Sequence, residues 1–337
     1  MLNLLCELCS IPSVSGREDA LRKFIISKIE GYAEYSVDPM GNLICFKAGK
    51  KPAAKKVMVD AHMDEVGIIA SGISSDGFVK FQTVGGIDPA VMLARKVVFE
   101  NGTVGVVGMK PVHLLSADEK KTMPKADSLY IDIGAASKEE AEGMVSVGDT
   151  AAFLSLPTAL GAENMLARGI DDKAGIAVLI NLLKSEAEYD FYATFTVQEE
   201  VGLRGAKAAA FTVSPDAAVI LESTTAADLY GVAEDKKVCL LGRGPAISFM
   251  DRSTLYNKQL FDFANGIDIP HQVKEYVSGG NNAGAVHLSK SGVPTVTVSL
   301  PTRYIHSPSC VASLRDLSDM QRYSLALIEA LASGEVL

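Results

Sequence analysis

The chain has 337 residues, of which 48% are hydrophobic and 22% are charged, the profile of a soluble globular protein. Its 32 basic and 41 acidic residues give a net charge of -9, which disfavours binding to a nucleic-acid backbone. No apolar stretch approaches the roughly 18 residues that a membrane span requires, and the N-terminus lacks the basic start of a signal peptide.

The five cysteines are scattered thinly along the chain, which fits reduced thiols better than a disulfide framework. Cys6 and Cys9 form a C-x-x-C motif, but no second pair follows that could complete a zinc site. We therefore interpret them as buried thiols of an opening amphipathic helix. We expect a cytoplasmic protein that binds neither nucleic acid nor membrane.

The N-terminal segment predicts the start of an α/β domain. Ser15 and Glu18 have the spacing of a capping box, and an apolar helical face begins behind them at Leu21. The run 57–62 has the composition of a short buried strand, and it ends at His62.

The middle and the C-terminal part of the chain differ in pattern. Between 65 and 163, short β-rich runs separated by Gly, Asn and Asp predict a small β-barrel or sandwich. Beyond 163, expected helices cover 173–184, 205–211, 283–291 and 314–332, and expected strands cover 192–197, 217–221 and 295–300. This alternation predicts an α/β fold with a mixed, largely parallel sheet and helices on both faces. We expect 1–64 and 164–337 to form a catalytic domain, into which 65–163 is inserted for dimerisation or larger assembly.

Five short motifs carry most of the residues suited to metal chemistry. They lie at or just beyond the C-terminal ends of predicted strands, the edge at which open α/β sheets bind ligands. Imidazole and carboxylate ligands without a thiolate suit zinc, cobalt or manganese, and their number fits two ions that share a bridging carboxylate. The motifs are His62-Met-Asp64, Asp171-Asp172-Lys173, Glu199-Glu200, Glu222 and His306.

Each motif taken alone has a structural alternative. Asp171 and Asp172 could cap a helix, and Glu199 and Glu200 could be solvated charges at a strand end. His306 could be an ordinary loop histidine. The metal interpretation depends on the motifs occurring together.

The ordered motifs resemble those of the tetrahedral aminopeptidases, a family that includes bacterial glutamyl aminopeptidases and proteins called endoglucanases. The matching segments are HMDEVG (62–67), GIDDKAG (169–175), QEEVGLRGA (198–206), LESTTAAD (221–228) and RYIHSPS (303–309). The resemblance covers almost the whole chain. It implies a zinc-peptidase-like fold and two divalent ions per subunit, zinc or cobalt. It also implies release of N-terminal residues from short peptides, and dimers that assemble into a hollow dodecamer.

The resemblance also assigns roles to single residues. One metal would be held by His62, Asp171 and Glu222, and the other by Asp171, Glu200 and His306, with Asp171 as the bridge. Asp64 would lie behind His62 and fix its orientation. Glu199 would be the general base that takes a proton from the bridging water and passes it to the leaving amine.

Two positions depart from the family pattern. Glu222 stands where relatives more often carry Asp, and Asp228 follows six residues later; we prefer Glu222 because it directly follows a predicted strand. Asn281 and Asn282 stand in a loop where relatives tend to have Asp, so substrate preference is open there. Arg303 could face an acidic side chain, but it belongs to the family pattern and decides nothing.

Other functions stay open as alternatives. A related dinuclear carboxypeptidase or deacylase would use the same metals on a different amide. An endoglucanase is disfavoured because the neighbouring Glu199 and Glu200 cannot straddle a sugar and the chain has no tryptophan. A non-catalytic binding protein is disfavoured because no expected ligand is missing. The apolar run 90–93 in the insert is expected to pack against a second chain.

Overall fold

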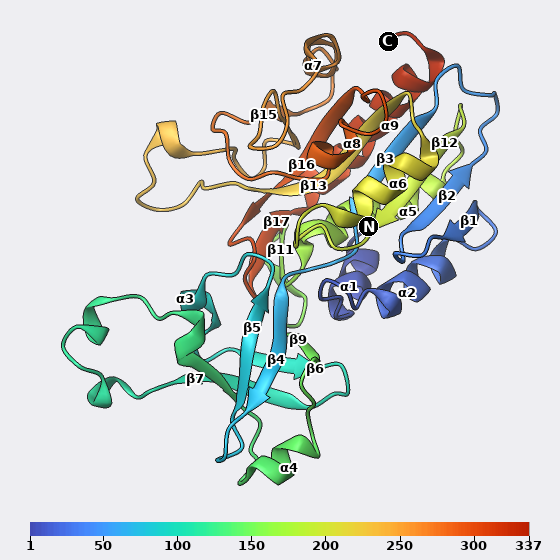
Figure 1. Ribbon diagram of the computed structural model, residues 1–337. Helices are drawn as coiled ribbons and strands as arrows, with labels where there is room; N and C mark the ends of the chain where they lie inside the picture. The colour runs from blue at the N-terminus through green and yellow to red at the C-terminus, as the bar shows by residue number, and fades with distance from the viewer. Residues whose placement is uncertain (337) are drawn as a thin grey trace.

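A large mixed sheet and a closed barrel contain the strands of the computed structural model, which describes residues 1–336 (Figure 1). Four neighbouring parallel strands form the centre of the large sheet: β12 (Phe191–Thr196), β3 (Val57–His62), β13 (Ala217–Thr225) and β16 (Thr295–Arg303). They are almost entirely buried, as expected for parallel strands covered on both faces.

Antiparallel pairs extend the sheet on both sides of this centre. Strands β2 (Leu43–Lys47) and β1 (Glu34–Val37) follow β12, whereas β17 (Cys310–Ser313), β11 (Asn164–Ala167) and β10 (Thr158–Leu160) follow β16. The short strands β14 (Ala246–Ile247) and β15 (Gln272–Val273) pair beside β16.

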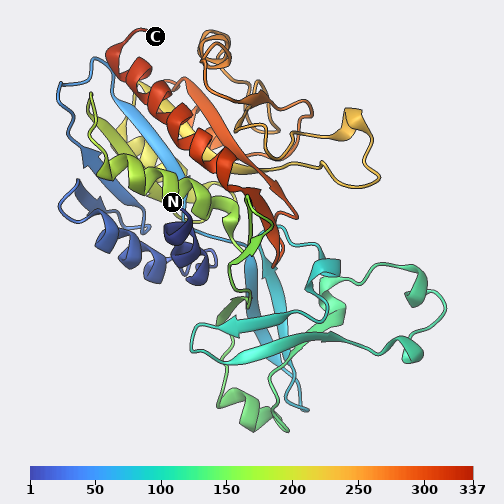
Figure 2. The same cartoon turned by 180° about the vertical axis from the view of Figure 1, so that it is seen from behind.

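Helices cover both faces of the sheet. One face packs against α1 (Leu2–Ser10), α2 (Asp19–Ile29), α5 (Ile170–Lys184) and α9 (Leu314–Ser333), and Figure 2 shows α5 and α9 lying across it. The other face, visible in Figure 1, carries α6 (Arg204–Val213) and α8 (Ala283–Val286). Helix α7 (Lys258–Asn265) packs against β14 and β16. The predicted α/β class with a mixed sheet is confirmed.

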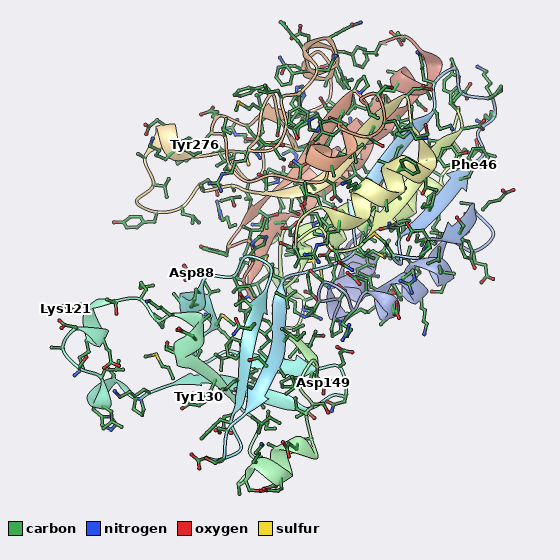
Figure 3. All side chains as sticks on the ribbon, in the orientation of Figure 1. Phe46, Asp88, Lys121, Tyr130, Asp149 and Tyr276 are labelled. Atoms are coloured by element: carbon green, nitrogen blue, oxygen red, sulfur yellow. The ribbon has the colours of Figure 1, made fainter. Side chains whose placement is uncertain are left out.

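The second part is a closed antiparallel barrel. Its strands are, in order around the barrel, β4 (Gly67–Ile73), β5 (Val79–Val84), β8 (Leu129–Asp132), β7 (Val104–Met109), β6 (Lys96–Phe99) and β9 (Thr150–Phe153). Its core contains Phe81, Val97 and Ile131. Short helices α3 (Pro89–Met92) and α4 (Lys138–Glu142) flank the barrel. The β7–β8 connection, which carries Lys121, extends away from the barrel (Figures 1 and 3). This connection contains three 3-10 turns, at Val112–Leu114, Glu119–Lys121 and Ala126–Ser128.

The barrel confirms one of the two expected architectures for the β-rich segment. Strand β10, at 158–160, falls inside the predicted insert but pairs with β11 in the large sheet. The domain boundaries therefore stay a prediction. In the apolar run 90–93, Met92 is buried in the barrel core and Leu93 is 37% exposed, so the run does not form one apolar surface.

Several elements differ in length from their predictions. Strand β13 runs to Thr225, so Glu222 lies inside the strand rather than just after it. Helix α8 ends at Val286, and a helix could not have continued to 291, because Lys290 adopts a left-handed backbone conformation. A 3-10 turn at Glu234–Lys236 lies in the connection after β13. No helix within residues 1–336 is both long enough and apolar enough to cross a bilayer.

Candidate metal centre

His62 ends the buried strand β3 and is itself 1% exposed. Its Nδ1 lies 2.9 Å from the backbone carbonyl oxygen of Asp64. Because that carbonyl can only accept, a neutral His62 donates from Nδ1 and leaves a lone pair on Nε2. Nε2 lies 3.3 Å from Asp171 Oδ1 and 3.3 Å from Glu222 Oε1. The Nε2 lone pair of His62 therefore faces the carboxylate oxygens of Asp171 and Glu222 with no hydrogen between them.

His306 approaches the same cluster from the loop between β16 and β17. Its Nδ1 lies 2.8 Å from the carbonyl oxygen of Gly86, in the segment that follows barrel strand β5. Its Nε2 lies 3.3 Å from Asp171 Oδ2 and 3.3 Å from Glu200 Oε2. The Asp171 carboxylate thus has one oxygen facing each imidazole.

Of Asp171 and Asp172, which could both have been helix-capping residues, only Asp172 caps a helix. Asp172 Oδ1 accepts from the Gly175 amide at 3.0 Å, three residues on, as a capping side chain does. Asp171 makes no such bond, and its backbone is non-helical, with φ -80° and ψ 109°. The peptide bond between the two residues is cis. Both carboxylate oxygens of Asp171 lie in the cluster, whereas Asp172 caps the helix with Oδ1 and keeps Oδ2 buried without a hydrogen-bond partner in residues 1–336.

Asp64 binds the segment that carries the two glutamates. Its carboxylate accepts from the amides of Glu199 at 2.8 Å and Glu200 at 3.1 Å. The Ser15 hydroxyl donates to Asp64 Oδ2 at 2.6 Å, so Ser15 makes no capping bond to α2. The capping-box prediction is wrong, because the long-range bond to Asp64 replaces the local one.

The structure brings the predicted ligands together, with His62, Asp171 and Glu222 buried and Glu200 and His306 partly exposed. Ligand atoms of His62, Asp171 and Glu200 lie within 4.8 Å of one another, and so do those of His62, Asp172 and Glu222. Asp172, which lies in one of the five motifs but was given no ligand role, thus also belongs to the cluster. The sequence analysis also did not identify the Gly86 carbonyl as a partner of His306. The only sequence signal for it is the Gly85-Gly86 pair, which lets the barrel segment approach the cluster closely.

The carboxylates of the cluster carry more negative charge than the surrounding cationic groups neutralise. Burial raises the pKa of Glu199, Glu200 and Glu222 well above the usual range, and the charge of Asp171 adds to each shift. Burial would lower the pKa of His62, but Glu222 and Asp171 outweigh it and raise that pKa. Oε2 of Glu222 is buried without a hydrogen-bond partner in residues 1–336.

A divalent cation fits these observations. It would satisfy the orphaned Glu222 oxygen and stand between the lone pairs of His62 or His306 and the carboxylates that face them. The donor set of imidazole nitrogen and carboxylate oxygen without thiolate suits zinc, cobalt or manganese. The residues therefore fit metal binding on chemical grounds.

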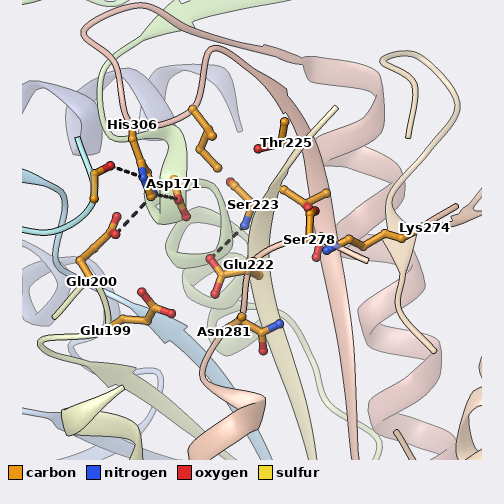
Figure 4. Close-up of a pocket in the computed structure, with 16 residues that line it drawn as sticks. Asp171, Glu199, Glu200, Glu222, Ser223, Thr225, Lys274, Ser278, Asn281 and His306 are labelled. Carbon is orange, nitrogen blue, oxygen red and sulfur yellow. Dashed lines mark hydrogen bonds and ion pairs between the residues drawn. The ribbon is translucent and has the colours of Figure 1, made fainter. Parts of the chain in front are cut away.

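The cluster opens into a cavity of about 350 Å³. Figure 4 shows Asp171, Glu200 and His306 on one side of it, with Glu199 and Glu222 beside them. The wall beyond Glu222 is formed by Thr225, Lys274, Ser278, Gly279, Gly280, Asn281 and Ser299. The predicted substrate loop thus does line the cavity, through 279–281.

Three other residues considered from the sequence lie outside this cavity lining, namely Asp228, Arg303 and Asn282. Asp228 accepts two bonds from Arg303, both at 2.7 Å, and neither residue lines the cavity. Asn282 is buried and donates to Asp60 at 2.8 Å and Thr196 at 3.0 Å. The geometry therefore favours Glu222 over Asp228 as a ligand.

The sequence is similar to those of known aminopeptidases over nearly its full length. A family model described as M42 glutamyl aminopeptidase matches residues 41–323. A putative aminopeptidase of Acetivibrio thermocellus is 38% identical, covering 98% of both chains. The lysyl aminopeptidase of Pyrococcus furiosus is 33% identical over 97% of this chain and 96% of its own. The glutamyl aminopeptidase of Lactococcus lactis is 31% identical over 98% and 96%.

Solved structures match over nearly the full length as well. A TET aminopeptidase from a marine-sediment Thaumarchaeota archaeon superposes with a TM-score of 0.94 at 34% identity, covering 99% of this chain and 97% of that one. The TET1 peptidase of Pyrococcus horikoshii gives 0.83 at 36% identity and 98% of both. A Thermotoga maritima protein described as an endoglucanase gives 0.81 at 36% identity and 99% of both. The chain belongs to the M42 glutamyl aminopeptidase family and is a peptide hydrolase.

Proposed function

We propose that the chain is an aminopeptidase with two divalent ions per subunit, and that it removes N-terminal residues from short peptides. The observation that carries this is the Asp171 carboxylate, whose two oxygens each lie 3.3 Å from a different imidazole nitrogen. A carboxylate that lies between two histidines could bridge two ions, which supports a dinuclear centre.

The contacts support one division of the ligands. His62 contacts Asp171 and Glu222, so these residues would hold one ion. His306 contacts Asp171 and Glu200, so these would hold the other. Zinc and cobalt suit such mixed nitrogen and oxygen donors. Bound ions would supply a water of lowered pKa and polarise the carbonyl of the scissile bond.

Glu199 would be the general base of the reaction. It lines the cavity next to the cluster, yet its carboxylate contacts neither imidazole, so it is not needed as a ligand. Burial raises its pKa well above the usual range, which makes its carboxylate a stronger proton acceptor. The hydrogen bond from its amide to Asp64 fixes its position. In this role it takes a proton from water and delivers it to the leaving amine.

Blocked peptides test this proposal. A tripeptide with a free N-terminus, its N-acetylated form and its C-amidated form should be assayed on metal-loaded enzyme. Acetylation removes the ammonium that positions the first peptide bond, so it should abolish most of the rate, whereas C-amidation should change little. The opposite result would identify a carboxypeptidase, and equal cleavage of all three would identify an endopeptidase or deacylase.

Chelation tests the metals separately. Dialysis against a chelator should remove the activity and the bound ions together, and zinc or cobalt should restore the activity. Elemental analysis of active enzyme should give two ions per subunit. Full activity in enzyme that contains no metal would contradict the proposal.

We also propose that copies of the chain assemble, as dimers that build a dodecamer. The β7–β8 connection exposes Val112 (69%), Leu114 (58%) and Met123 (68%), and apolar side chains gathered on one exposed loop mark an interaction site. The related Pyrococcus horikoshii peptidase assembles into a tetrahedron or an octahedral shell. Sedimentation should give a particle of twelve chains, and Leu114→Asp with Met123→Asp should dissociate it. A wild-type monomer at all concentrations would contradict assembly.

A cytoplasmic location belongs to the same proposal. All five cysteines are free thiols in the structure, which supports a reducing compartment. Detection of the protein in the cytoplasmic fraction of its host would test this, and detection in a secreted fraction would contradict it.

A further inference from the structure

The loop 278–281 forms a wall of the cavity and includes none of the candidate ligands and not the candidate base. All four of its residues line the cavity, and Figure 4 shows Ser278 and Asn281 on the side away from Glu200 and His306. A peptide bound in the cavity would contact this loop. The position of the loop should therefore matter for peptide binding rather than for the chemical step.

The buried carboxylate of Asp251 joins a turn behind this wall to the loop. Its Oδ1 accepts from the amides of Ser253 and Thr254, both at 2.8 Å, and so closes its own turn. Its Oδ2 accepts from the Tyr256 hydroxyl at 2.6 Å and from the side-chain amide of Asn281 at 3.1 Å. A buried carboxylate needs such donors, so these four bonds are expected to persist together.

The side chain of Asn281 is engaged on both of its polar atoms. Besides Asp251, its Nδ2 donates to the Tyr256 hydroxyl at 3.2 Å. Its Oδ1 accepts from the Thr297 hydroxyl of strand β16 at 3.2 Å and from the Ala283 amide at 2.8 Å. The hydroxyl oxygens of Tyr256 and Thr297 lie 2.7 Å apart, which completes the network. The side chain of Asn281 therefore serves to hold the loop and has no polar atom left for a substrate.

The backbone of the loop is attached to the same turn. The Gly279 carbonyl accepts from the Arg252 amide at 2.9 Å, which is the single hydrogen bond that the segment 276–280 makes to the rest of the described chain. Packing is close as well, since a Cβ atom on Gly280 would lie 2.9 Å from the Ser253 hydroxyl oxygen. A glycine-rich segment with so few bonds of its own has many accessible conformations, so its position depends on the turn.

We propose that Asp251 and Tyr256 are positioning residues for peptide binding, because through Asn281 they hold the loop 278–281 where it contacts the substrate. This inference rests on the proposed aminopeptidase function. A loop that occupies its binding position for only part of the time lowers the apparent affinity in proportion. Because the loop supplies neither a metal ligand nor a base, its displacement should raise KM and leave kcat nearly unchanged.

Tyr256→Phe and Tyr323→Phe form a matched pair for kinetics on metal-loaded enzyme, with an aminoacyl-anilide that the wild type cleaves. Each removes one hydroxyl that donates a hydrogen bond inside the fold, but the Tyr323 hydroxyl donates to the Ala264 carbonyl, and neither of these residues lines the cavity. Tyr256→Phe should raise KM by about 10-fold, the value of one hydrogen bond to a charged group, with kcat and the bound metal nearly unchanged. Tyr323→Phe should change neither KM nor kcat, although both variants lose some stability.

Cleavage of the folded protein by chymotrypsin measures the loop without any turnover. Tyr276 is 46% exposed and lies two residues before the loop, so a loop that leaves its position should make the bond after Tyr276 easier to cleave. Cleavage at this bond, followed by mass spectrometry, should be faster in Tyr256→Phe than in the wild type or in Tyr323→Phe. Asp251→Asn, which keeps one acceptor oxygen, should change KM and this cleavage in the same direction as Tyr256→Phe.

The outcomes separate this inference from the function on which it rests. If the wild type cleaves no aminoacyl-anilide, the aminopeptidase proposal fails and this inference fails with it. If the wild type is active but Tyr256→Phe keeps its KM, or raises it no more than Tyr323→Phe does, only the positioning role is overturned. A measurement on the wild type alone covers the case of variants that do not fold. The amino acid that the enzyme releases, added at saturation, should slow cleavage after Tyr276, and an unchanged rate would overturn the inference.

Discussion

The carboxylate of Asp64 accepts a hydrogen bond from the backbone amide of Glu199 at 2.8 Å, although 135 positions separate the two residues. Its second oxygen accepts from the amide of Glu200 at 3.1 Å and from the Ser15 hydroxyl at 2.6 Å. The backbone carbonyl of the same residue faces His62. Asp64 therefore fixes the positions of a candidate base and two candidate ligands without entering the cavity itself.

Asp64→Asn should reduce activity by about 10- to 100-fold, the usual effect of losing a group that orients metal ligands. An amide has one acceptor oxygen instead of two, so its NH2 group would face a backbone N–H that needs an acceptor. Ser15→Ala removes one donor and leaves both amide bonds, so its effect should be smaller. Steady-state rates and metal content of the two variants measure this. Equal activity of Asp64→Asn and wild type would show that the bonds from Glu199 and Glu200 do not position these residues.

Glu199→Gln and Glu200→Gln should separate the roles of the two adjacent glutamates. Glu199→Gln removes a base but no ligand, so turnover should fall by about 10²- to 10⁴-fold with the metal content unchanged. Glu200→Gln replaces a residue that contacts His306 at 3.3 Å, so it should lose bound metal as well. Elemental analysis beside kinetics gives both readouts. Loss of metal in Glu199→Gln alone would mean that the roles are exchanged.

Much of the fold and of the site could be predicted because it depends on local patterns. The strand 57–62 was predicted to the residue, since its apolar composition stops where His62 begins the polar segment. Helix α9 was predicted within one residue from its amphipathic period. His62, Glu200 and Glu222 were found because they lie at or near the ends of parallel strands, where an α/β sheet binds ligands, whereas Asp171 follows the antiparallel strand β11.

The rest depends on contacts between distant segments. The pairing of Ser15 with Asp64 leaves no local trace, so the spacing of Ser15 and Glu18 indicated a capping box instead. The Gly86 carbonyl that faces His306 belongs to the barrel, and its position depends on how the barrel meets the sheet. Lys274 follows a two-residue strand with no periodicity, and only the folded chain places it in the cavity.

The pH dependence of stability should contain a contribution from Glu18. Its buried carboxylate accepts from the amides of Gly16 at 2.7 Å and Gln198 at 3.2 Å, and burial raises its pKa from 4.5 to about 7. Between these values the folded state holds a proton that the unfolded state has lost. The contribution of Glu18 is therefore fully present below pH 4.5 and is lost as the pH rises through about 7.

Glu18→Gln should remove this part of the pH dependence. Urea unfolding of wild type and variant from pH 4.5 to 7.5 gives the difference in their free energies of unfolding, in which the other titrating groups largely cancel. The variant should gain stability relative to wild type as the pH rises. A difference that is constant over this range would show that the pKa of Glu18 is not raised.

Glu65 lies where the barrel joins the sheet, and it is the acidic member of a buried charge cluster. Its carboxylate forms ion pairs with Arg168 and, at 3.0 Å, with Lys173, and it accepts from the Ser13 amide at 2.9 Å. Burial acts to raise the pKa of Glu65, but the two cations outweigh it and lower the pKa to about 2. Glu65, Arg168 and Lys173 are each less than 5% exposed, so water does not screen their charges.

Glu65→Gln should destabilise the protein by about 3–5 kcal/mol, because it leaves Arg168 and Lys173 buried without a compensating charge. The matched control is Glu186→Gln, which removes the carboxylate of an exposed ion pair with Lys50 and should change stability little. Urea unfolding at pH 7 compares the two substitutions in the free energy of unfolding. A similar small loss in both variants would show that the buried cluster is no more stabilising than the surface pair. A large loss in Glu65→Gln alone would show that burying Arg168 and Lys173 without the Glu65 charge is costly.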